Sequence, residues 1–135
     1  MPRTIQVPLN SPIKEKLDSS LLSRDSMRSC AQLRRAKAIL GVSSADLGTI
    51  FGITRQAVES WTKKVPVYRR ADVARVADVA DRLAKTFRSE RIPQIAREPI
   101  PVLGGKSIIT TLSKRNGAAS VLEGLDRLAS YVPLP

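Results

Sequence analysis

The hydrophobic positions of this chain recur mostly at intervals of three and four residues, which is the period of an amphipathic helix. The clearest case runs from Asp72 to Phe87, where one apolar stripe contains Val73, Val76, Ala80, Leu83 and Phe87. No stretch alternates apolar and polar residues over a useful length, so no β-strand is expected. The pattern predicts an all-α fold of six or seven helices.

Cap residues and helix breakers define the other expected helices. Asp25–Leu40 is predicted to be helical, with Gly41 as its stop. Before Asp25 we expect an arm that holds at most one short helix, which would begin at Ser11-Pro12 and end at Leu17. A short helix is also expected among Pro93, Pro99 and Pro101. The remaining expected helices, each with a cap or a glycine or proline stop, are 43–51, 54–63, 107–114 and 118–131.

The strongest local signal is the segment from Ser44 to Lys64, SADLGTIFGITRQAVESWTKK. Apolar residues recur where its two short helices would meet, namely at Leu47, Phe51, Ile53, Val58 and Trp61. Gly48 is a small residue for a close helix crossing, and Gly52 can adopt the positive φ that the turn requires. The segment therefore predicts a helix-turn-helix. The alternative is two amphipathic helices that simply abut, which leaves the helix-weakening cost of both glycines unexplained.

In a helix-turn-helix, the exposed side of the second helix enters the major groove with its N-terminal end. Arg and Gln side chains there can bind guanine and adenine edges through two hydrogen bonds, and lysines beyond the helix can bind phosphates. Thr54 is as well explained by a capping role, and the arginines before the segment by a solvated helix face. The candidate DNA-binding residues are Arg34, Arg35, Ser44, Thr54, Arg55, Gln56, Ser60, Lys63 and Lys64.

Charge strengthens the case for a polyanionic partner. The 135 residues carry a formal net charge of +11, and basic residues occur in both halves of the chain. The chain has no histidine and a single cysteine, Cys30. This cysteine lies within a predicted helix and is expected to be a small packing residue. Zinc sites of Cys and His ligands and catalysis by a histidine base are therefore excluded. We expect no enzyme activity, no catalytic residue, no metal and no cofactor.

The sequence contains no stretch of 18 apolar residues and no apolar signal-peptide core. A cytoplasmic, nucleoid-associated protein without membrane contact is therefore expected. Gly104-Gly105-Lys106-Ser107 is superficially similar to a phosphate-binding loop. That motif needs a glycine where this chain has Ile100, so the run does not predict a nucleotide site.

The run TRQAVESW followed by Val65-Pro66 resembles the recognition helix and exit turn of the Xre family of phage repressor and Cro-like proteins. Residues 72–135 resemble the C-terminal domain of the Xre/MbcA/ParS antitoxins. The positions that fit that pattern are Pro99, Leu103, Gly104, Gly105, Ser107, Leu112, Gly117, Val121 and Leu125. Ile95 and Ala96 depart from it, because the family usually has Trp-Leu there.

The second resemblance implies that the chain neutralises a RES-fold toxin, which depletes NAD, and represses the operon that both share. The last helix and the tail would then face the toxin, through Tyr131, Val132, Pro133, Leu134 and Pro135. The chain is therefore expected to comprise a partly disordered arm (1–24), a helix-turn-helix domain (25–67) and a helical C-terminal domain (68–135), for which the resemblance implies toxin binding or dimerisation. A homodimer on double-stranded operator DNA is expected, although a monomer on an asymmetric site is possible. The alternative is a phage-type or stand-alone repressor without a toxin, whose basic C-terminal half also contacts DNA.

Overall fold

The computed structural model describes residues 12–131 of the chain, and side chains from residue 24 to residue 128. This part is all-helical, with no β-strand, which confirms the predicted all-α class. The α-helices are α1 (Pro12–Leu40), α2 (Ser44–Phe51), α3 (Arg55–Trp61), α4 (Arg70–Thr86), α5 (Ile92–Arg97), α6 (Ile108–Leu112) and α7 (Gly117–Tyr131). Three short 3-10 helices lie between them, η1 (Val67–Arg69), η2 (Ser89–Arg91) and η3 (Pro101–Leu103).

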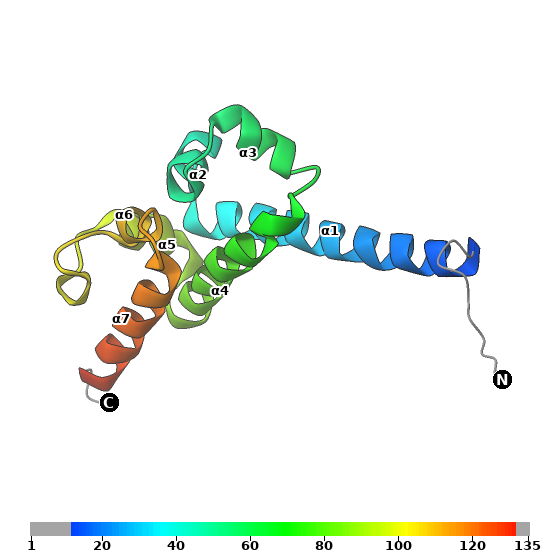
Figure 1. The fold of residues 1–135 in the computed structure, drawn as a ribbon. Coiled ribbons are helices and arrows are strands. Elements are labelled where there is room, and N and C mark those ends of the chain that lie inside the picture. The colour runs from blue at the N-terminus through cyan, green and yellow to red at the C-terminus, as the bar shows by residue number, and fades with distance from the viewer. Residues whose placement is uncertain (1–11, 132–135) are drawn as a thin grey trace.

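Helix α1 begins earlier than the sequence predicted. The predicted start at Asp25 was wrong, because one continuous helix runs from Pro12 to Leu40. A proline is tolerated in the first turn of a helix, and no glycine or proline follows it before Gly41. Figure 1 shows that the N-terminal half of α1 extends away from the other helices. Residues 1–11 of the predicted arm lie outside the described residues.

The core is formed where α4 crosses α1 and meets α7 (Figure 1). Leu33 of α1, Leu83 of α4 and Val121 of α7 are all fully buried in one hydrophobic cluster. The predicted stripe of α4 is confirmed, since Val73, Val76, Ala80 and Leu83 face this cluster. One core therefore includes residues from both predicted domains, and the division after residue 67 stays a prediction.

The remaining helices have the predicted caps and shorter ends. Ser107 caps α6 by accepting a hydrogen bond from the backbone N–H of Thr110, as predicted. Helices α3 and α6 each end two residues before the predicted position, at Trp61 and Leu112. No helix among the described residues combines the length and the hydropathy needed to cross a bilayer.

Candidate nucleic-acid interface

Helix α2 begins at a complete capping box. The Ser43 hydroxyl accepts a hydrogen bond from the Asp46 backbone N–H, and the Asp46 carboxylate accepts one from the Ser43 backbone N–H. This reciprocal pair satisfies two N–H groups that the helix itself leaves without an acceptor. The Ser44 hydroxyl accepts a hydrogen bond from Lys37 Nζ at 3.1 Å. Ser44 thus links α2 to the end of α1.

A tight turn connects α2 to α3. Gly52 ends α2 in the left-handed conformation, with φ +70° and ψ +35°. The backbone N–H of Ile53 then donates to the Gly48 carbonyl oxygen at 2.8 Å. A Cβ atom on Gly48 would lie 2.6 Å from the Ile53 carbonyl oxygen, which is closer than real Cβ contacts allow. The close approach at Gly48 and the positive φ at Gly52 therefore both occur where the sequence analysis expected them.

Helix α3 has one buried face and one exposed face. Thr54 caps it by accepting a hydrogen bond from the Ala57 backbone N–H at 3.0 Å. On the inner face, Val58 is fully buried and Trp61 is 6% exposed. The outward residues are all exposed, namely Arg55, Gln56, Glu59 and Ser60. The inner face of α3 is therefore packed against the core, and its outer face presents arginine, amide, carboxylate and hydroxyl groups to solvent.

An ion pair lies on the exposed face of α3. Arg55 Nε donates to Glu59 Oε2 at 3.3 Å, and the two side chains are 68% and 53% exposed. Residues four apart on a helix face one another, so this pair forms without any tertiary contact. An exposed pair of this kind is weak, and Arg55 can exchange Glu59 for another acceptor.

The C-terminal end of α3 is held by contacts from three other segments. The Trp61 ring packs against the Phe51 ring of α2, with ring centroids 5.4 Å apart. The Arg69 guanidinium lies over the Trp61 ring, with its Cζ atom 5.1 Å from the ring centroid. From α1, Cys30 Sγ lies 3.4 Å from the Trp61 carbonyl oxygen, and Arg34 donates to the Thr62 carbonyl oxygen at 2.8 Å.

The structure brings most of the predicted basic residues toward α3, with one exception. Arg34 contacts the end of α3, and Lys63 and Lys64 are exposed just beyond Trp61. Arg35 instead forms two hydrogen bonds of 2.9 Å to the Asp81 carboxylate, so it joins α1 to α4. Its guanidinium is paired with Asp81 and points away from α3. Arg35 therefore does not lie with the other candidate DNA-binding residues.

The predicted toxin-facing residues cannot be placed in the same way. Tyr131 is the last residue of α7, and its side chain lies outside the described residues. Val132, Pro133, Leu134 and Pro135 also lie outside them. The LGG run that carried the resemblance does form a turn against α7, because the Leu103 side chain packs where Gly124 lacks a Cβ atom.

Arg69 is the contact residue that the sequence analysis missed. Its Nη2 donates to the Phe51 carbonyl oxygen at 2.6 Å, and its Nε lies 2.9 Å from Asp72 Oδ2. Arg69 therefore joins α2, α3 and the start of α4. Only its spacing of three residues from Asp72 hinted at a local pair, and its contacts to α2 and α3 depend on the tertiary fold.

Other chemistry is sparse in the described part of the chain. No group of three or more His, Cys, Asp or Glu residues that could hold a metal ion occurs among the described residues. Comparisons of the chain with protein-family models and with curated proteins found no match.

Proposed function

We propose that this protein is a sequence-specific DNA-binding regulator, in which α2 and α3 act as a helix-turn-helix and α3 enters the major groove. The observation that carries the proposal is the division of α3 into a buried and an exposed face. Val58 and Trp61 hold the helix to the core, while Arg55 and Gln56 are exposed at its capped N-terminal end, where bases could replace Glu59 as the partner of Arg55. The net charge of +11 supports a polyanionic partner.

The arginine, amide and lysine groups on and beyond α3 have different expected roles. The Arg55 guanidinium suits guanine O6 and N7, and the Gln56 amide suits adenine N7 and N6. Lys63 and Lys64 are exposed beyond the helix end, where they suit phosphate contacts that carry no sequence information. The protein would then act as a repressor by occupying an operator.

The test begins with selection of a preferred duplex from a random pool, followed by fluorescence anisotropy on that duplex and on a scrambled one. Arg55→Ala and Gln56→Ala are expected to weaken binding to the selected duplex by about ten- to a hundredfold, and to relax base preference. Lys64→Ala is expected to weaken both duplexes alike. Arg91→Ala removes an exposed arginine of η2 far along the chain and is the matched control.

Two results would contradict the proposal. The first is equal loss on both duplexes for Arg55→Ala, which would make Arg55 a phosphate contact. The second is a binding constant that does not change between low and moderate salt. Because phosphate contacts release counterions, the binding constant should fall steeply with salt. In a plot of log binding constant against log salt concentration, the slope should be about −0.9 per phosphate contact.

We further propose the antitoxin role that the resemblance of residues 72–135 implies, with a RES-fold toxin as partner and a homodimer on a two-fold operator. The test is deletion of residues 131–135 from the full chain, with toxin co-expression and duplex titration as readouts. Loss of protection with duplex affinity retained would support a toxin-facing tail. Loss of duplex affinity would favour the alternative, a phage-type or stand-alone repressor whose C-terminal half contacts DNA. Sedimentation of the full chain measures the oligomeric state.

A further inference from the structure

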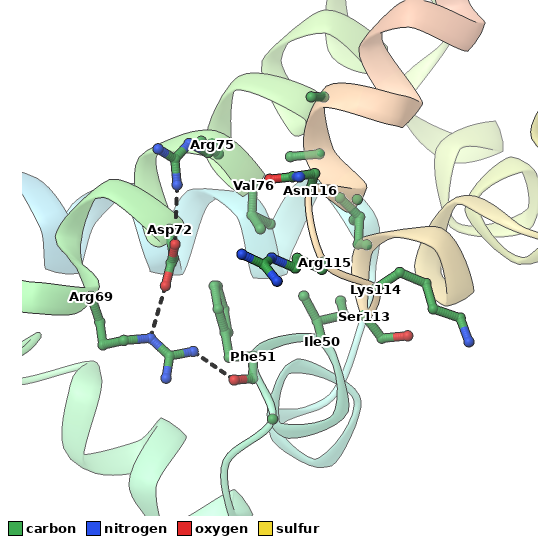
Figure 2. A pocket seen from close by; sticks show the side chains of 15 residues that line it. Ile50, Phe51, Arg69, Asp72, Arg75, Val76, Ser113, Lys114, Arg115 and Asn116 are labelled. Carbon is green, nitrogen blue, oxygen red and sulfur yellow. Dashed lines mark hydrogen bonds and ion pairs between the residues drawn. The ribbon is translucent and has the colours of Figure 1, made fainter.

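A basic hollow separates the start of α4 from the loop between α6 and α7. It is open to solvent and has a volume of about 420 Å³, and Figure 2 shows the side chains that line it. Three arginines belong to its lining, namely Arg69 at the end of η1, Arg75 in α4 and Arg115 in the α6–α7 loop. Asp72 is the one acidic residue among the described lining residues. The hollow therefore carries an excess of positive charge.

Two of these arginines, Arg69 at the end of η1 and Arg75 in α4, pair with the same carboxylate. Asp72 pairs through Oδ2 with Arg69 at 2.9 Å and through Oδ1 with Arg75 at 3.2 Å (Figure 2). Arg69 is fixed further by its hydrogen bond to the Phe51 carbonyl oxygen. Each guanidinium has five N–H donors, so these contacts leave donors for another acceptor. One carboxylate between two guanidinium groups still leaves a net positive charge.

Arg115 completes the hollow from the opposite wall. Figure 2 shows its side chain pointing into the hollow between Val76 and Phe51, while the neighbouring Lys114 points away. Arg115 forms no side-chain hydrogen bond or ion pair with any other described residue. The exposed, unpaired guanidinium of Arg115 thus lies across the hollow from the paired guanidinium groups of Arg69 and Arg75, and like charges repel. An anion between them would relieve this repulsion.

The rest of the lining narrows the class of anion. Apolar side chains of Phe51, Val76 and Leu112 form part of the wall beside the arginines. A volume of about 420 Å³ falls within the range of small-molecule sites, well above the size of a single phosphate ion.

We propose that this hollow binds a phosphate-bearing small molecule of mononucleotide size, with the phosphates on the three arginines and the less polar part against the apolar wall. Guanidinium groups match phosphate oxygens through paired hydrogen bonds, which makes arginine the residue suited to such a site. The proposal does not require DNA binding, so it stands or falls independently of the function proposed above.

The experiment is calorimetric titration of the full chain with ADP, pyrophosphate and adenosine at low ionic strength. ADP and pyrophosphate are expected to bind, and adenosine, which lacks phosphate, is expected to bind at least tenfold more weakly. Arg115→Ala is expected to weaken ADP binding by about tenfold or more, because a charge-assisted hydrogen bond is lost. Arg91→Ala removes the same charge elsewhere and should change ADP affinity less than twofold. Arg75→Ala serves as a second variant, and circular dichroism verifies that each variant is folded.

The same variants distinguish a free phosphate ligand from DNA phosphates. Equal duplex affinity for Arg115→Ala and Arg91→Ala, with ADP binding lost only in the former, supports the proposal. Absence of ADP and pyrophosphate binding up to millimolar concentration overturns it, as does equal ADP affinity for the two variants. If Arg115→Ala weakens duplex binding alone, the hollow receives a DNA phosphate and the small-molecule proposal is wrong.

Discussion

Replacement of Gly48 by alanine tests how closely α2 and the start of α3 must approach. The new Cβ atom would lie 2.6 Å from the Ile53 carbonyl oxygen, below the 3.0 Å that real Cβ contacts maintain. The obstacle is backbone, so no side-chain rotation can relieve it. The turn must open, and this strains the 2.8 Å hydrogen bond from Ile53 N–H to the Gly48 carbonyl oxygen.

The expected cost follows from three opposing contributions. Overpacking in a well-packed site costs about 1–3 kcal/mol. Weakening of the backbone hydrogen bond adds about 0.5–1.5 kcal/mol. Alanine has a higher helix propensity than glycine, which returns about 0.5–1 kcal/mol. We therefore expect Gly48→Ala to lower the free energy of unfolding by roughly 2 kcal/mol, the middle of the range that these contributions give.

Thermal unfolding followed by circular dichroism measures this effect. For a chain of this length, each kcal/mol lowers Tm by about 3–5 °C, so a decrease of roughly 6–10 °C is expected. Gly52→Ala is the matched control, because its φ is +70° and no atom lies within 4 Å of the added Cβ. It should cost only the conformational penalty of about 1 kcal/mol. A Gly48→Ala variant as stable as the wild type would refute the close approach.

Two further predictions concern α3, and two concern the Arg35–Asp81 pair between α1 and α4. Thr54→Ala removes the N-cap of α3 and should destabilise the protein by about 1 kcal/mol in denaturant unfolding, whereas Thr54→Ser should not. Glu59→Gln removes a negative charge from the exposed face and should tighten duplex binding roughly fivefold in anisotropy titrations, about 1 kcal/mol; weaker binding would mean that Glu59 accepts from a base. A double-mutant cycle on Arg35 and Asp81, which are 46% and 37% exposed, should give a coupling below about 1 kcal/mol. Arg35→Ala should also leave duplex affinity within twofold, and a larger loss would restore Arg35 to the DNA-contacting set.

Much of the local structure could be predicted from the sequence, because its causes act over a few residues. The capping box of Ser43 and Asp46, the cap at Thr54 and the left-handed Gly52 depend only on neighbours along the chain. The stripe of α4 follows from helical periodicity, so its buried face was also predictable. Helix ends were predicted less accurately. The predicted start of α1 at Asp25 was wrong, because no helix-breaking residue separates Pro12 from Asp25.

Only the tertiary structure decided how distant side chains are used. Arg34 and Arg35 are adjacent in sequence, yet one contacts the end of α3 and the other pairs with Asp81 of α4. Adjacent residues on a helix point about 100° apart, so the packing of α1 against α4 and α3 determined their partners.

The basic hollow shows the same limit more strongly. Arg69 and Arg75 precede Arg115 by 46 and 40 residues, and nothing in their local sequence indicates that they share a site. Composition determined that the molecule is strongly cationic, and periodicity determined that it is helical. The crossing of the helices decided which arginines come together. Long-range contacts depend on how whole helix faces pack and not on the order of neighbouring residues.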